Sequence, residues 1–276
     1  MTKKCIGLIA AVAVMGFTVA KADIGNTINN AAAGSTVTVS GTYSVAEEVK
    51  VPSGVTIKGP ATFNFTTGTS TTAGLYCDSG SGQKIQSITV TGANHGIDVQ
   101  VASVQVTSCI AHNNYNTGII CENSGAKSDT ISGCTSYDNV DSETGGGNAD
   151  GFGCKQSTGS GINFTSDTAY DNSDDGFDYE KAGSPVTSTS CTSHNEGSYD
   201  GYQGNGNGFK MGIGGDDTAD VYTSCTAYDN TAGNSPHGFS TNGNTGKIKL
   251  TKCHSYGNGE DDVLGNCVLS NCTMQQ

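Results

Sequence analysis

The sequence predicts an all-β protein: a right-handed parallel β-helix with an asparagine ladder and a short N-terminal cap. Three observations support this fold class. A six-residue segment recurs six times, starting at residues 109, 134, 167, 191, 225 and 253. Short β-rich runs separated by Gly, Ser and Pro precede the repeats, and no long helical periodicity interrupts them. The copies start 24 to 34 residues apart. Repeats with this spacing are typical of a solenoid, in which each coil buries its apolar face only against its neighbours.

The N-terminal 22 residues have the features of a secretory signal peptide. Two lysines precede an apolar run at 5–20, and the small-x-small triplet at 20–22 fits a cleavage site. A membrane anchor is the alternative, but the run is short for a span of about 20 residues. We therefore expect a signal peptide at 1–22, a single parallel β-helix domain at 23–276, and a secreted, extracellular protein.

The first elements of the mature chain are predicted to be a cap on the N-terminal end of the solenoid, followed by its first strands. Residues 24–34 are expected to form a short amphipathic helix that ends at Gly34 and covers the exposed end of the sheet. The β-rich runs that follow, at 36–39, 55–57 and 88–90, are expected to be short strands joined by turns.

The recurring segment predicts a ladder of stacked amides. Its copies read C-I-A-H-N-N, C-T-S-Y-D-N, D-T-A-Y-D-N, C-T-S-H-N-E, C-T-A-Y-D-N and C-H-S-Y-G-N. Coils of a β-helix stack about 4.8 Å apart, so equivalent side chains meet and can hydrogen-bond along the axis. The sixth position therefore predicts an asparagine column with one glutamate in it: Asn114, Asn139, Asn172, Glu196, Asn230 and Asn258.

A second pattern is centred on a glycine followed by an apolar residue. The residue after the glycine predicts an inward apolar column: Ile119, Phe152, Phe177, Phe209 and Phe239. Because side chains alternate along a strand, the residue before each glycine and the residue two after it are predicted to face solvent. These two outward columns are Thr117, Asp150, Asp175, Asn207 and His237, and Ile120, Gly153, Asp178, Lys210 and Ser240.

The outward columns gather four carboxylates and one lysine. Asp150 and Asp175 should lie about one strand spacing apart, with Asp178 and Asp174 beside them. Carboxylates this close repel one another unless a cation lies among them, and an oxygen-only site suits Ca²⁺, whereas zinc prefers His or Cys. The alternative is that D-G and D-D-G are only turn residues, but four carboxylates in adjacent registers favour calcium.

The overall charge excludes several classes of partner. The formal charge of −13 becomes −16 without residues 1–22, which hold three lysines and no acidic residue. Nucleic acid and anionic membranes are therefore poor partners. The sequence has no arginine, so mechanisms that require a guanidinium are excluded.

Lys210 follows Asp178 in the same column, one coil further on. A salt bridge that neutralises the cluster is one interpretation. The other is a general base, because a nearby Ca²⁺ would lower the pKa of the lysine, while the four carboxylates act in the opposite direction. Calcium and a basic lysine suit removal of the proton α to a carboxylate, which in a uronic acid polysaccharide leads to β-elimination.

Three motifs carry a family resemblance: N-A-D-G-F-G-C-K at 148–155, N-S-D-D-G-F-D at 172–178 and G-N-G-F-K at 206–210. They resemble family 9 polysaccharide lyases, calcium-dependent pectate lyases of the parallel β-helix type, and the resemblance extends from about residue 35. It implies a catalytic domain at 23–276 that acts on polygalacturonate, an acidic polysaccharide, with Ca²⁺ as cofactor. It further implies Lys210 as the base and four calcium ligands: Asp150, Asp174, Asp175 and Asp178.

Lys155 closes the first of these motifs. Its side chain could reach a substrate carboxylate, and an ordinary surface lysine is the equal alternative. We also expect a monomer, because a capped solenoid buries its own faces.

Other functions remain open at the level of sequence. A polygalacturonase-like hydrolase would need one protonated and one ionised carboxyl group, and its family uses an Arg-x-Lys element that this chain lacks. Alginate and chondroitin lyases of the β-helix type typically add an arginine as well. A non-catalytic calcium-binding adhesin or glycan-binding module shares the fold, but has no need for a lysine beside the metal.

The mature chain holds ten cysteines. An even number in an exported protein permits disulfides, for which Cys121 with Cys154, Cys109 with Cys134, and Cys225 with Cys253 are candidates. A stack of buried thiols is the other interpretation.

Overall fold

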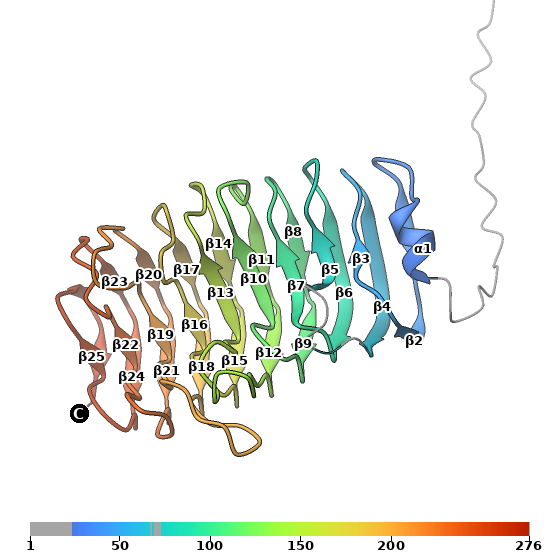
Figure 1. The fold of residues 1–276 in the computed structure, drawn as a ribbon. Helices are drawn as coiled ribbons and strands as arrows, with labels where there is room; N and C mark the ends of the chain where they lie inside the picture. Colours follow the sequence, from blue (N-terminus) through green and yellow to red (C-terminus); the bar gives the residue numbers. More distant parts are fainter. Residues whose placement is uncertain (1–23, 67, 69–72, 276) are drawn as a thin grey trace, which may run out of the picture.

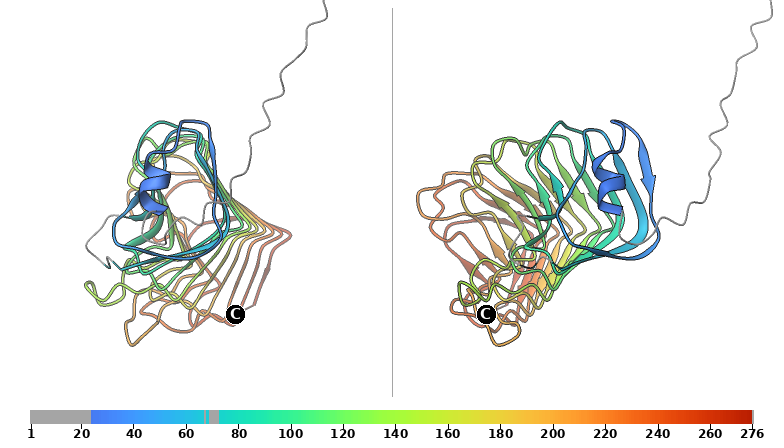
Figure 2. Two further views of the ribbon diagram at one scale, coloured as in Figure 1. Left: turned by 90° about the vertical axis from the view of Figure 1, so that its right-hand side faces the viewer. Right: turned by 45° about the vertical axis from the view of Figure 1, so that its right-hand side comes forward.

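The computed structural model describes residues 24–66, 68 and 73–275, and these residues form a parallel β-helix (Figure 1). Within them, every named strand pairs in parallel with its equivalents on neighbouring coils, which stack along one axis (Figures 1 and 2). The predicted signal peptide at 1–22 lies outside the described residues. In the part of the chain that is described, no helix is long and apolar enough to cross a membrane.

One face of the solenoid carries the candidate site. Among the described residues it is a nine-stranded sheet made of β3 (Val49–Lys50), β5 (Ala73–Cys77), β7 (His95–Val99), β10 (Ile119–Glu122), β13 (Phe152–Lys155), β16 (Phe177–Asp178), β19 (Phe209–Lys210), β22 (Phe239–Ser240) and β25 (Val263–Leu264).

The rest of each coil belongs to a second sheet with two arms. The first arm holds β1 (Thr36–Thr38), β8 (Gln105–Thr107), β11 (Thr130–Ser132), β14 (Asn163–Thr165), β17 (Thr187–Thr189), β20 (Val221–Thr223), β23 (Lys249–Thr251) and β26 (Val268–Ser270). The second holds β2 (Gly41–Val45), β9 (Ile110–His112), β12 (Thr135–Tyr137), β15 (Thr168–Tyr170), β18 (Thr192–His194), β21 (Thr226–Tyr228), β24 (His254–Tyr256) and β27 (Thr273–Met274). The longer strands β4 (Thr56–Phe65) and β6 (Lys84–Thr91) belong to both arms.

The predicted N-terminal cap is present but shorter than expected. Helix α1 (Ile24–Asn29) covers the first coil (Figure 2). It buries Ile24 and Ile28 against the core. The helix was predicted to reach Gly34, but the chain leaves the helical conformation after Asn29 and turns into β1. Gly34 has a positive φ of 76°, so it belongs to this turn, and glycine adopts that conformation without steric cost.

The repeated Y-D-N segments form the strands and turns of the second arm. The aspartates after the tyrosines, Asp138, Asp171 and Asp229, have φ values of 55°, 55° and 53°. This left-handed conformation is one that Asp and Asn tolerate better than most residues. The turn directs the next residue inward, where it joins the predicted ladder.

The asparagine ladder is confirmed. Asn114 Nδ2 donates to Asn139 Oδ1 at 3.0 Å, and Asn139 Nδ2 donates to Asn172 Oδ1 at 2.8 Å. Glu196 replaces an amide without breaking the column, because its Oε2 accepts from Asn172 Nδ2 at 3.0 Å. On its other side, the Glu196 amide donates to Asn230 Oδ1 at 3.1 Å.

The inward apolar column is confirmed too. The rings of Phe152, Phe177, Phe209 and Phe239 stack with centroid separations of 4.8, 4.7 and 4.8 Å, and all four are fully buried. Glycine precedes each phenylalanine because the chain passes close to the second arm. A Cβ on Gly151 would lie 2.7 Å from the Cβ of Ala169, which is too close for two side chains.

The ten cysteines of the described residues are all free thiols, and eight of them are buried. The interpretation as a thiol stack therefore describes this structure. Several thiols donate to backbone carbonyls of the neighbouring coil, for example Cys225 Sγ to the carbonyl of Ser188 at 3.4 Å.

One prediction was wrong: the two outward columns do not face solvent. Their members point away from the core, as expected, but Asp150, Asp175, Lys210 and His237 are 0%, 0%, 6% and 3% exposed. The longest repeats, in the coils that start at 134 and 191, carry loops beside these columns: Thr117 Oγ1 donates to the carbonyl of Asn148 at 3.1 Å, and Asn205 N donates to Asp174 Oδ1 at 2.6 Å. The 141–148 loop meets the 197–206 loop there, where Gln203 N donates to the carbonyl of Gly145 at 3.1 Å.

Candidate active site

The candidate site lies on the nine-stranded face, over β13, β16 and β19. The strand register pairs Phe152 with Phe177 and Phe177 with Phe209, as the aligned motifs predicted. Gly153, Asp178 and Lys210 therefore follow one another on successive coils. Asp150 and Asp175 lie directly before Gly151 and Gly176, the glycines of the first two motifs. The site follows from the repeat, since positions 25 or 32 residues apart in sequence become neighbours.

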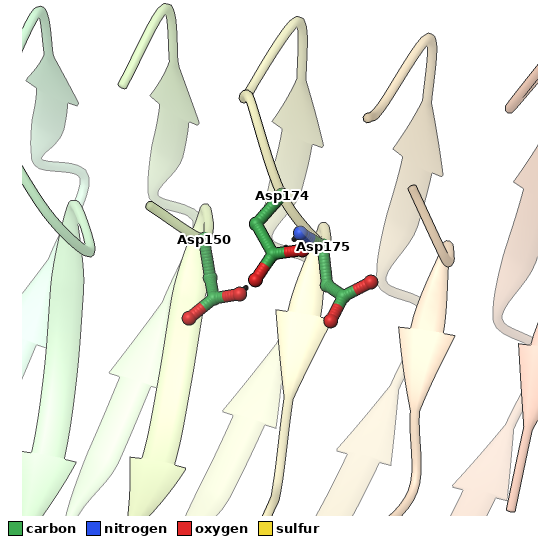
Figure 3. A group of neighbouring side chains, drawn as sticks. All are labelled: Asp150, Asp174 and Asp175. Carbon is green, nitrogen blue, oxygen red and sulfur yellow. Dashed lines mark hydrogen bonds between the residues drawn. The ribbon is translucent and has the colours of Figure 1, made fainter. Parts of the chain in front are cut away.

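Three of the four predicted carboxylates form a tight group. Asp150, Asp174 and Asp175 each place a carboxylate oxygen within 4.8 Å of the others (Figure 3). Asp150 comes from one coil, and Asp174 and Asp175 from the next, where the backbone turns into β16. The Asp175 amide donates to Asp150 Oδ1 at 3.3 Å, which ties the two coils together at this point.

Only some carboxylate oxygens of this group accept hydrogen bonds. Asn205 N donates to Asp174 Oδ1 at 2.6 Å, and Asn207 donates to Asp175 Oδ1 from both its amide and its Nδ2, at 2.8 Å each. Asp175 Oδ2 and Asn207 Oδ1 are buried and accept no hydrogen bond from any described residue. An unsatisfied buried carboxylate oxygen is costly, so the group has unused capacity for a cation.

Asp178, the fourth predicted ligand, has a different environment. Its Oδ2 contacts two ammonium groups, those of Lys155 at 2.7 Å and Lys210 at 3.2 Å. Its Oδ1 accepts from the amide of Glu180 at 2.9 Å. Asp178 thus anchors the two lysines of the site, and these lysines also contact Asp150 and Asp175.

Lys155 is a member of the cluster and not a free surface lysine. Its Nζ lies 2.8 Å from Asp150 Oδ2 and 2.7 Å from Asp178 Oδ2, so it bridges carboxylates of two coils. The Lys155 side chain is 18% exposed.

Lys210 lies deeper, with a side chain that is 7% exposed. Its Nζ is 3.5 Å from Asp175 Oδ2 and 3.1 Å from Glu180 Oε2. The sequence analysis did not include Glu180 in the site. Its position two residues after Asp178 carried the signal, because period-2 alternation places both side chains on the same side of the strand.

Burial and charge separate the pKa values of the four aspartates. Burial raises the pKa of Asp150 to about 7 and holds the pKa of Asp174 well above its usual range, helped for Asp174 by the charges of its carboxylate neighbours. Burial also raises the pKa of Asp175, although Lys210 opposes it. For Asp178, burial acts upward too, but the charges of Lys155 and Lys210 outweigh it and lower the pKa.

Both lysines remain protonated in this environment. Burial alone would lower the pKa of each, but the surrounding carboxylates, Asp150 and Asp178 for Lys155 and Asp178 and Asp175 for Lys210, raise the pKa above its ordinary value. The sequence left the sign of the Lys210 shift open, and in the arrangement described here the carboxylates determine it.

The donor set fits a hard cation. It consists of carboxylate and amide oxygens without a thiol or an imidazole, and it includes an unsatisfied buried oxygen on Asp175. Calcium takes six to eight such oxygens at about 2.4 Å, and water can complete the shell where protein oxygens are too few. The residues that would hold it are Asp150, Asp174 and Asp175, with Asp178 adjacent.

These features define the class of protein: a parallel β-helix that carries an acidic, oxygen-only site with two lysines on one face. The chain belongs to the family described as "Pel9A-like, right handed beta helix region", whose model matches residues 15–269. This membership confirms the predicted handedness and the resemblance to family 9 pectate lyases.

Curated relatives are pectate lyases. The chain is 36% identical over 165 residues to pectate lyase L of Dickeya dadantii, an alignment that covers 58% of this chain and 37% of that protein. It is 32% identical over 171 residues to pectate lyase PEL9 of Emericella nidulans, covering 53% of this chain and 40% of that protein. The chain therefore matches less than half of the length of these relatives.

A solved structure shares the fold. The crystal structure of pectate lyase Pel9A superposes with a TM-score of 0.78 at 24% sequence identity, covering 91% of this chain and 73% of that one. The structure of a rhamnogalacturonan lyase also shares the fold, with a TM-score of 0.64 at 21% sequence identity, covering 84% of this chain and 68% of that one.

Proposed function

We propose that this protein is a secreted pectate lyase that cleaves α-1,4-linked polygalacturonate by β-elimination, with calcium as cofactor and Lys210 as base. The observation that carries the proposal is the position of Lys210 Nζ, 3.5 Å from Asp175 Oδ2 and 3.2 Å from Asp178 Oδ2, at the edge of an oxygen-only cation site. The names of the relatives support it.

The aspartates would hold the cation and so allow an acidic protein to bind an acidic polymer. Asp150, Asp174 and Asp175 would be the first ligands, and Asp178 would complete the set. Bound calcium would supply positive charge to the substrate carboxylate, stabilise the enolate-like charge formed when the α proton leaves, and offset the carboxylates that hold Lys210 protonated.

Lys210 would act on the substrate proton. Its neutral Nζ would take the proton at C5 of the uronate, the C4–C5 double bond would form, and the bond from C4 to the glycosidic oxygen would break. The leaving oxygen would take a proton from water. Because the carboxylates raise the pKa of Lys210, this amine is available as a base only when added positive charge offsets them.

Lys155 would provide a second positive charge for the polymer. Its side chain is the more exposed of the two, and a uronate carboxylate next to the reacting sugar is a suitable partner. We propose a monomer that acts on this polysaccharide, with no nucleic acid or membrane partner.

The alternatives predict different chemistry at the same residues. Inverting hydrolysis needs room for a water between two carboxyl groups, but Lys155 Nζ lies 2.8 and 2.7 Å from the oxygens of Asp150 and Asp178. A non-catalytic calcium-binding module would leave Lys210 without a chemical role.

The test is incubation of the protein with polygalacturonate, with calcium and separately with EDTA. A lyase produces the ultraviolet absorbance of an unsaturated uronide together with new reducing ends, and EDTA abolishes both. Reducing ends without absorbance would indicate a hydrolase. Binding without either product would indicate a non-catalytic module, and both of these results contradict the proposal.

A further inference from the structure

Lys155 closes the acidic cluster toward solvent. Its side chain is 18% exposed, whereas the side chains of Asp150 and Asp178 are 0% and 1% exposed. Asp174 and Asp175 are 4% and 0% exposed as residues. Lys155 is therefore the most exposed of these side chains, while its ammonium lies against the buried oxygens of Asp150 and Asp178.

The same ammonium occupies oxygen atoms that a cation would need. Lys155 Nζ contacts Asp150 Oδ2 at 2.8 Å, and this oxygen also accepts from Thr117 Oγ1 at 3.1 Å. It contacts Asp178 Oδ2 at 2.7 Å, the oxygen that also contacts Lys210. Both contacts are short, charge-assisted hydrogen bonds, which are the stronger kind.

We propose that Lys155 is an internal counter-cation of this site, which calcium displaces from Asp150 and Asp178 when it binds. The ammonium then becomes free to pair with a carboxylate of the polyuronate. This inference rests on the proposed function for the identity of the cation, and it adds a competing group within the protein that sets the affinity for calcium.

The physical basis is competition between two cations for the same carboxylates. Without a metal, a buried group of several carboxylates is costly, and a lysine that can fold over it reduces the repulsion. With a divalent ion present, the ammonium would lie within a few ångström of a like charge and would move outward. Lys155 is long and flexible enough for this movement.

Thermodynamic linkage then fixes the direction in which the loss of the Lys155 ammonium changes calcium affinity. If calcium and the ammonium exclude each other, removal of the ammonium must tighten calcium binding. A residue that only holds the aspartates in position would have the opposite effect, because its loss would disorder the ligands. The direction of the change in calcium affinity therefore distinguishes competition from support.

The experiment is a calcium titration of the metal-free protein by calorimetry at pH 8, without substrate. In Lys155→Met, we expect the dissociation constant of calcium to fall by at least about fivefold, the lower range of couplings between binding events. Lys155→Arg keeps the charge and should stay close to wild type. Lys50→Met is the matched control, because Lys50 lies on the same face but pairs with Asp78 at 2.7 Å, away from the cluster.

The outcomes separate cleanly. Unchanged or weaker binding in Lys155→Met overturns the inference, as does equal tightening in Lys155→Arg or in Lys50→Met. If wild type binds no calcium, the proposed function fails. If wild type is a calcium-dependent lyase and Lys155→Met binds calcium as wild type does, only the present inference fails.

A second measurement uses the wild-type protein and does not depend on whether a variant folds. Amine acylation is followed at each lysine by mass spectrometry, with Lys50 as the internal reference. Displacement predicts that Lys155 reacts faster in calcium than in EDTA relative to Lys50, because the amine leaves its two carboxylates. An unchanged or slower reaction of Lys155 overturns the inference.

Discussion

Asp175 and Asp178 lie three residues apart on one coil, and the pKa values of their carboxyl groups shift in opposite directions. Both side chains are buried, which raises the pKa of any carboxyl group. Asp178 Oδ2 contacts two ammonium groups, whereas Asp175 Oδ2 has one lysine at 3.5 Å and no hydrogen bond. The nearby positive charge decides the direction of each pKa shift, and it leaves Asp175 Oδ2 as the oxygen with capacity for a cation.

Lys210 is the residue on which the proposed chemistry depends. Substitution of Lys210 by Met keeps the length of the apolar stem and removes the amine. Loss of a general base typically costs about 10²- to 10⁴-fold in rate, so we expect kcat on polygalacturonate to fall by at least that range. Calcium affinity, measured by calorimetry, should not fall, because the variant removes a positive charge and no ligand.

The matched control for this variant is Lys181→Met, since Lys181 is exposed and pairs with Glu180 at 3.0 Å. It should retain wild-type turnover. Activity of Lys210→Met equal to that of Lys181→Met would refute the base assignment, and a loss of calcium binding in Lys210→Met would show that the lysine supports the metal site instead.

For individual residues, the sequence predicted which side chains come together at the site but not which ion pairs they form. The common Gly-Phe pair aligned the motifs, and the strand register confirmed that Asp178 and Lys210 are neighbours. The position of Lys155 between Asp150 and Asp178 was not predictable, because a long side chain can reach several partners from the same backbone position. Glu180, by contrast, was missed although its position two residues after Asp178 carried a signal.

The asparagine ladder is the element that locks successive coils together at one corner. Glu196 is its one acidic member among the described residues, and it is fully buried. Burial holds its pKa well above the usual range, although hydrogen bonds from Asn172 and Ser193 oppose the shift. A neutral side chain of the same shape would make these contacts without a buried charge.

We therefore expect Glu196→Gln to stabilise the protein at pH 8. The amide oxygen can accept from Asn172, and the amide nitrogen can donate to Ser193 Oγ, which lies 3.2 Å from Glu196 Oε1. The free energy of unfolding, measured with urea, should rise by about 1 kcal/mol, the typical scale for one pKa unit. The gain should shrink toward pH 4, where wild type is protonated as well.

Glu196→Ala provides the contrast, because it leaves the buried amide of Asn172 without a side-chain acceptor. It should destabilise the protein by about 1–3 kcal/mol. Equal destabilisation by Gln and Ala at pH 8 would show that the ionised carboxylate is favoured in the ladder, contrary to this argument.

Elements with strict periodicity were the predictable ones. The phenylalanine and asparagine columns follow from a side-chain period of 2 within strands and from the recurrence of the segment along the chain. The loops at 141–148 and 197–206 have no such period. Their contacts with Thr117 and Asp174 could not be predicted, because a longer repeat shows where an insertion lies but not where it folds.

Across the whole molecule, acidic groups outside the candidate site are also buried in turns. Asp129, Asp167 and Asp220 are fully buried, and each accepts a hydrogen bond from a backbone amide of a neighbouring coil. Burial raises the pKa of each carboxyl group to about 7, although the backbone amides oppose the shift. The coils are therefore joined by carboxyl groups that are neutral in mildly acidic solution.

These groups give the stability of the molecule a defined pH dependence. In the unfolded chain an aspartate has a pKa of about 3.9, so each group contributes stability that is fully present below about pH 4 and is lost as the pH rises through about 7. We expect the free energy of unfolding, measured with urea in EDTA, to fall by several kcal/mol between pH 4.5 and about 8, at about 1.4 kcal/mol per pKa unit for each group. Asp167→Asn removes one titrating group and should flatten the slope by about one proton. Stability that rises over this range, or a slope that Asp167→Asn leaves unchanged, would show that these carboxyl groups are ionised inside the folded solenoid.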